Sequence, residues 1–156
     1  MNNNIIITGY TPDHQTGIAD LLDGIQAEFT ESIYARSTPG REVLLPPVTY
    51  WVALQDGVVV GTAGIAALAY GNAMLKGMMV QQEQRGTGLA ARLLDAVLGY
   101  AATMGAEQLY LGTMTQFKAA QRFYNKHGFR RITMQELPAD FIINPVDDVF
   151  FSLALH

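Results

Sequence analysis

The segment Arg85–Ala90 holds the residues of this chain best suited to binding a charged ligand. It reads Arg-Gly-Thr-Gly-Leu-Ala, follows a mostly apolar run and a polar loop, and opens an amphipathic helix. A strand, a glycine turn and a helix start direct free backbone N–H groups and the positive end of the helix dipole at one point. Gly86 and Gly88 let a phosphate approach the backbone closely, and Arg85 offers a charged, bidentate partner. The turn therefore predicts a site for a phosphate-bearing ligand.

The elements around this turn form a strand–helix–strand unit. Apolar residues recur at helical spacing from Leu89 to Met104, and Gly105 ends the helix. The apolar segment 108–114 then reads as a strand, like the segment 73–80 before the turn. A crossover helix makes the two strands parallel and adjacent, and we expect them to diverge where the ligand enters.

The rest of the chain predicts a mixed α/β fold, with a mostly antiparallel sheet of six to seven strands flanked by helices. Segment 28–47 is rich in turn residues and is expected to form an irregular flap. The other predicted elements are a strand at 4–8, a helix capped by Asp13, a hairpin of 50–55 and 58–68, a helix at 118–126, and strands near 131–136 and 148–155.

Composition narrows the class of protein. The 156 residues are expected to form one domain, 1–156, and 49% hydrophobic with 15% charged residues favours a well-filled core. A net charge of −4 does not favour binding to nucleic acid, whose phosphate backbone is negative. The absence of cysteine excludes disulfides, thiolate metal sites and a cysteine nucleophile. With no signal peptide or apolar span in the sequence, we expect a cytoplasmic protein that does not bind membranes.

Two motifs resemble those of the GNAT superfamily of N-acetyltransferases. Arg85–Ala90 resembles the acyl-CoA motif Q/R-x-x-G-x-G/A of that family, and Ala120–Phe129 resembles its A-x-x-x-Y-x-x-x-G-F signature. The strand ending at Val80 and the order of the elements are also similar to those of the family. The resemblance covers most of the chain.

The resemblance implies transfer of an acetyl group from acetyl-CoA to a primary amine of a small molecule or peptide by direct attack, in a monomer or a homodimer. Backbone N–H groups of the turn hold the pyrophosphate, and the strand edge pairs with the pantetheine amides. Tyr124 takes the family position of the general acid that protonates the leaving thiolate. The cofactor-binding residues implied are Met78, Met79, Val80, Arg85, Gly86, Thr87, Gly88, Leu89 and Ala90.

The sequence departs from the family at two places. Phe117 stands where many members carry an asparagine, so Gln116 is a candidate for that contact with the cofactor. Strand 73–80 lacks the carboxylate that many relatives use as a base. Another acid or a water chain then takes the proton of the amine, and the candidate acids are Glu28, Glu31 and Glu83.

Three other hypotheses stay open at this point. Residues 86–91 also satisfy the dinucleotide pattern G-x-G-x-x-G/A, with Glu107 where a ribose-binding acid is expected. However, five polar residues separate Val80 from Gly86, and too little chain follows for further βαβ units. A second alternative is a glycine turn that binds no ligand. The third is a CoA-binding sensor or interaction module without catalysis.

Overall fold

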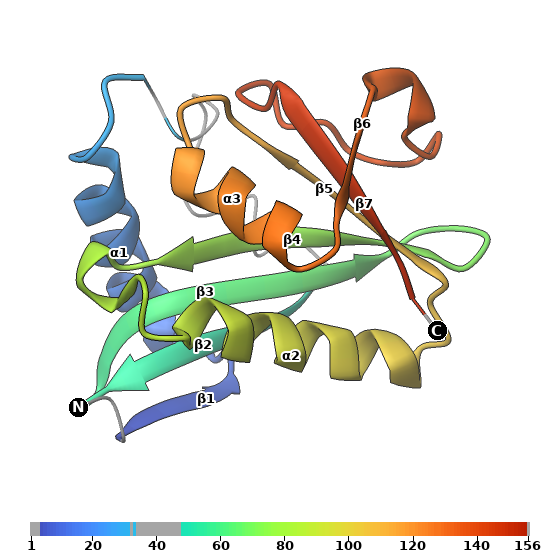
Figure 1. Ribbon diagram of the computed structural model, residues 1–156. Coiled ribbons are helices and arrows are strands. Elements are labelled where there is room, and N and C mark those ends of the chain that lie inside the picture. Colours follow the sequence, from blue (N-terminus) through green and yellow to red (C-terminus); the bar gives the residue numbers. More distant parts are fainter. Residues whose placement is uncertain (1–3, 32, 34–47, 156) are drawn as a thin grey trace.

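The computed structural model describes residues 4–31, 33 and 48–155, so most of the expected flap at 28–47 lies outside the described residues. Seven strands form one sheet in the order β1-β2-β3-β4-β5-β7-β6, in which only β4 and β5 pair in parallel (Figure 1). The strands are β1 (Ile5–Gly9), β2 (Val48–Gln55), β3 (Val58–Ala67), β4 (Asn72–Val80), β5 (Gln108–Thr113), β6 (Arg130–Ile132) and β7 (Val149–Ala154).

Helices cover both faces of the sheet. Helices α2 (Leu89–Thr103) and α3 (Lys118–Lys126) lie on one face, and α1 (Gln15–Gln26) lies on the other (Figure 1). Side chains alternate across a strand, so Val59 packs against α1 while its neighbour Val60 packs in the core with α2. This burial on both faces explains the long apolar run of β3.

The predicted parallel pair opens into a gap at the centre of the sheet. Residues Asn72–Met74 of β4 pair with Gln108–Tyr110 of β5, and the remaining residues of these two strands do not pair with each other. Two residues of β4, Gly77 and Met78, face one residue of β3, which makes a β-bulge. The expectation that these strands are adjacent, parallel and divergent is confirmed.

Gly77 is required in this bulge for two reasons. Its φ is +58°, and a Cβ at this position would collide with the Tyr50 hydroxyl. The Thr62 hydroxyl donates a hydrogen bond of 2.6 Å to the carbonyl oxygen of Gly77. The bulge is therefore held in place by the neighbouring strands β2 and β3.

Two predictions about elements are wrong at their ends. Asp13 does not cap α1: a 3-10 turn, Pro12–His14, precedes the helix, and Thr11 and His14 form its capping box. The strand expected near 131–136 is β6, which ends at Ile132 because a second capped 3-10 turn, Met134–Glu136, follows. No helix in the described part of the chain is long and apolar enough to cross a membrane.

Candidate functional site

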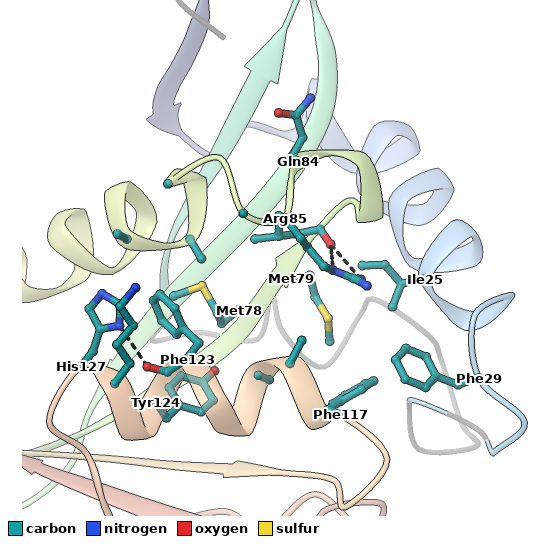
Figure 2. Close-up of a pocket in the computed structure, with 18 residues that line it drawn as sticks. Ile25, Phe29, Met78, Met79, Gln84, Arg85, Phe117, Phe123, Tyr124 and His127 are labelled. Carbon is teal, nitrogen blue, oxygen red and sulfur yellow. Dashed lines mark hydrogen bonds between the residues drawn. The ribbon is translucent and has the colours of Figure 1, made fainter. Parts of the chain in front are cut away.

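A cavity of about 370 Å³ lies between the end of β4, the glycine turn and α3 (Figure 2). Its walls include most of the residues that were predicted from the sequence to bind the cofactor. Thr87 and Leu89 do not line it: the Thr87 hydroxyl donates to the carbonyl oxygen of Gln84, and Leu89 is buried in the core. The residues from the sequence prediction that do line it are Met78, Met79, Val80, Arg85, Gly86, Gly88, Ala90 and Tyr124.

The glycine turn presents bare backbone to this cavity. Gly86 has a φ of +80° and Gly88 a φ of +91°, and beyond the adjoining residues no described atom lies within 4 Å of a Cβ built on either. Their N–H groups take part in none of the turn and loop hydrogen bonds found in the described residues. The first N–H groups of α2 also lack partners within the helix. The turn can therefore hold an anion against the backbone.

The Arg85 guanidinium points away from the open turn. Its Nη2 donates at 3.0 Å to the carbonyl oxygen of Val80 and at 3.0 Å to Glu28 Oε2 (Figure 2 shows the contact with Val80). Glu28 follows the end of α1, so Arg85 joins this region to the end of β4. In this arrangement the guanidinium is engaged by Glu28 and Val80, whereas the N–H groups of Gly86 and Gly88 are left to bind an anion.

Apart from Tyr124, the remaining ionisable residues around the cavity are basic. Lys126 and His127, at the end of α3, line it together with Arg85, and no acidic residue of the described chain does so. The His127 ring is oriented by a contact of 2.9 Å between Nδ1 and the carbonyl oxygen of Phe123. A protein of net charge −4 thus has a cavity suited to a polyanion. Lys126 and His127 were missed because only the fold brings the end of α3 opposite the turn.

Tyr124 lies in the gap of the sheet, at the junction of two cavities. Its ring is buried against Phe129 and Phe151, and Phe123 and Tyr124 rise from α3 beneath Met78 (Figure 2). Burial raises the pKa of the Tyr124 phenol well above its ordinary value, and the charge of Asp147 adds to the rise. The hydroxyl therefore stays protonated at neutral pH, as a proton donor must.

A second cavity of about 130 Å³ lies between β4, the end of β5 and the segment before β7. Met78, Met79, Phe117, Ala120 and Tyr124 belong to the walls of both cavities. The charged residues in its described wall are Lys76 of β4 and Asp147, two residues before β7. Tyr124 therefore borders both cavities.

Asp147 is a site residue that the sequence analysis missed. Burial raises the pKa of its carboxyl to about 7; the charge of Asp148 adds to this rise and that of Lys76 opposes it. A carboxyl with such a pKa is suited to accepting a proton near neutral pH. The only signal in the sequence was a pair of acids, Asp147 and Asp148, directly before an apolar strand.

The acids that the sequence offered as bases lie elsewhere. Glu28 is paired with Arg85, and Glu83 is exposed in the 3-10 turn before the glycine turn. The backbone N–H of Glu31 donates to Gln116, whose amide donates in return to the Glu31 carbonyl. Neither Gln116 nor any of these acids lines either cavity.

Comparison with known proteins agrees with this geometry. The model of the acetyltransferase (GNAT) family matches residues 18–129, well over half of the chain. The chain belongs to the GNAT family of acetyltransferases. An acetyltransferase of this family from Staphylococcus aureus Mu50 has the same fold, with a TM-score of 0.89 and 30% sequence identity over 97% of this chain and 99% of that one.

Relatives from mycobacteria and from human extend the comparison. Uncharacterized N-acetyltransferases from Mycobacterium bovis and Mycobacterium tuberculosis are 33% identical over 121 residues, 76% of this chain and 69% of theirs. Human N-acetylaspartate synthetase is 31% identical over 115 residues, or 71% of this chain, but the match spans 38% of the human protein. As a GNAT acetyltransferase, the protein uses acetyl-CoA as the acetyl donor. The open glycine turn and the basic cavity fit this polyanionic co-substrate.

Proposed function

We propose that this protein transfers the acetyl group of acetyl-CoA to a primary amine of a small molecule or peptide by direct attack. The observation that carries the proposal is the pair of cavities that meet at Tyr124 through the gap between β4 and β5. One cavity is basic and ends at the glycine turn, as the donor requires. The other holds a carboxylate and is suited to an amine.

Each part of the donor cavity has a role in this proposal. The N–H groups of the glycine turn and of the α2 N-terminus hold the pyrophosphate, with Lys126 as a cationic partner and His127 as a further polar one. The unpaired edge of β4 near Met78 offers backbone groups to the pantetheine amides. Acetyl-CoA supplies a thioester whose carbonyl carbon is the electrophile. Holding both substrates at the gap makes the attack effectively unimolecular.

Tyr124 is the proposed proton donor. The amine nitrogen forms the new C–N bond while the C–S bond breaks and its electron pair leaves on sulfur. The Tyr124 hydroxyl gives its proton to that sulfur, and the second proton of the nitrogen returns to the tyrosine through solvent. The buried, protonated phenol in the wall of both cavities supports this role.

A screen of acceptors tests the proposed function. Free CoA thiol is measured after acetyl-CoA is mixed with the protein and with amino acids, polyamines, aminoglycosides or peptide N-termini, and mass spectrometry identifies the acetylated product. We expect thiol release that depends on one class of amine. A protein that binds acetyl-CoA in calorimetry and releases thiol with none of these amines is instead a CoA-binding sensor or interaction module.

A further inference from the structure

We infer that the cavity between β4 and the segment before β7 binds a small amine that also carries an acidic group, and that Asp147 accepts the proton of its ammonium. This inference rests on the proposed acetyl transfer and names the acceptor class of that same site. It gives the reaction a base that lies outside strand β4.

Main-chain bonds hold Asp147 over the gap. The N–H of Asp147 donates to the carbonyl oxygen of Asn144 at 2.9 Å, and the N–H of Asp148 donates to that of Thr113 at 2.9 Å. Asp147 Oδ2 lies 2.8 Å from where a Cβ on Gly112 would be, so only glycine at 112 leaves room for the carboxylate in this position. The fold thus directs Asp147 across the end of β5.

The two neighbouring aspartates differ in what they contact. The Asp148 carboxylate accepts hydrogen bonds from the Thr115 N–H at 2.8 Å and from the Thr115 hydroxyl at 2.9 Å, so it anchors the turn after β5. The Asp147 carboxylate instead lines the cavity, where the charge of Lys76 acts on it. A carboxylate at a cavity wall is a natural partner for an incoming ammonium group.

The charges around the cavity favour an acceptor with both an amine and an acid. Lys76 lies on β4 in the wall of the same cavity; the charges of Asp148 and Lys76 act on Asp147, and the charge of Asp147 acts on Tyr124. Most of the other described wall residues are apolar, among them Leu22, Phe141 and Ile142 in addition to those shared with the donor cavity. An aminocarboxylate places its ammonium at Asp147 and its acid toward the positive charge of Lys76. Polyamines carry no acidic group and so cannot make the contact with Lys76.

The volume of this cavity, about 130 Å³ against about 370 Å³ for the donor cavity, favours a small acceptor.

The proton balance follows from the positions of the two acids. Asp147 takes one proton from the acceptor ammonium, which frees the lone pair for attack on the acetyl carbon. Tyr124 protonates the departing sulfur and recovers a proton from the nitrogen as the amide forms. The net products are the acetylated amine, free CoA thiol and one proton, which Asp147 releases to solvent.

The test combines acceptor pairs with variants. The proteinogenic amino acids and β-alanine are compared with amines that lack the acid, such as propylamine for β-alanine and ethylamine for glycine. We expect kcat/KM, expressed for the neutral form of each amine, to be at least tenfold higher for at least one aminocarboxylate than for its counterpart without the acid, and K76Q to reduce this preference. The D147N variant should lower kcat/KM at pH 7 by ~10²-fold, with unchanged affinity for acetyl-CoA in calorimetry.

The pH profile separates proton transfer from a structural role. Toward pH 10 the neutral fraction of an α-amino acid's amine in solution rises steeply, so the deficit of D147N with an α-amino acid should shrink there. E83Q, which removes an exposed acid outside both cavities, is the control and should keep the wild-type profile. Turnover with plain amines alone, or an equal rate for each pair, overturns the acceptor class. A D147N variant with wild-type activity at pH 7 overturns the base. Failure of the wild type with every amine overturns the proposed function instead.

Discussion

Arg85 and Glu28 form an ion pair that ties the end of β4 to the end of α1. The Arg85 Nη2 reaches Glu28 Oε2 and the Val80 carbonyl oxygen at 3.0 Å each, and the two side chains are only 32% and 16% exposed. The ion pair engages the Arg85 guanidinium, which the sequence analysis had assigned to the anion site. It also fixes the strand end from which the glycine turn starts.

This ion pair predicts energetic coupling between the two residues. We expect the free-energy changes of unfolding for Arg85→Met and Glu28→Gln to be non-additive, with a coupling of ~1 kcal/mol, because each change removes the same charge-assisted contact. Urea denaturation of the wild type, both single variants and the double variant measures this cycle. Additive effects would show that the contact contributes nothing to stability.

The glycine turn predicts a loss of ligand affinity that is separable from a loss of stability. Gly88→Leu places a side chain at a φ of +91° in open space that the phosphate needs. Gly57→Leu is a matched control, because its φ is +80°, its surroundings are also open, and it lies in the β2–β3 hairpin. We expect both variants to lose ~1–2 kcal/mol of stability and only Gly88→Leu to bind acetyl-CoA at least ~10-fold more weakly by calorimetry. Equal affinity in the two variants contradicts the site.

Local chemistry explains what could be predicted from the sequence. Two glycines before an amphipathic run specify a turn and a helix start wherever they stand, and the crossover rule then makes β4 and β5 parallel neighbours. The start of α1 was misplaced because Pro12 takes the first position of a 3-10 turn, so the capping moves from Asp13 to Thr11. Competing caps a residue or two apart are hard to rank from a pattern.

Long-range contacts explain why other features of the site could not be predicted from the sequence. Asp147 lies 71 positions after Lys76, and only the register of β5 with β7, which pairs Thr113 with Val149, brings it to the gap. Likewise, the direction of the Arg85 guanidinium depends on Glu28, 57 positions earlier. No periodicity or motif encodes such pairs, so a base from the segment before β7 required the fold.

The bulge of β4 predicts that Gly77 does not tolerate substitution. Gly77→Ala forces a Cβ against the Tyr50 hydroxyl at a φ of +58°, and we expect a loss of ~2–4 kcal/mol in the free energy of unfolding. Gly99→Ala, in the open interior of α2, is the control and should gain ~0.5–1 kcal/mol. The damage should be smaller in a Tyr50→Phe background, which removes the colliding oxygen. Thermal melting of the four variants checks this, and a harmless Gly77→Ala contradicts it.

Asp147 predicts a pH dependence of stability. Its pKa is about 7 when folded, against an ordinary value of 3.8, so the folded state binds this proton more tightly than the unfolded state does. The stabilisation is complete below pH 4 and is lost as the pH rises to about 7. Asp147→Asn stays neutral, so between pH 4 and 8 it should gain ~2–4 kcal/mol relative to the wild type. Parallel melting curves for the two proteins across this range would exclude the raised pKa.

Single-turnover kinetics of Tyr124→Phe test the central claim, that acetyl transfer takes place in the gap of the sheet. The variant keeps the buried ring and removes only the hydroxyl, and Tyr100→Phe on the outer side of α2 is the control. With an accepted amine in excess, we predict unchanged affinity for acetyl-CoA, wild-type rates for Tyr100→Phe, and a transfer rate lowered by ~10²–10⁴-fold for Tyr124→Phe. A Tyr124→Phe variant that transfers the acetyl group at the wild-type rate would contradict the account.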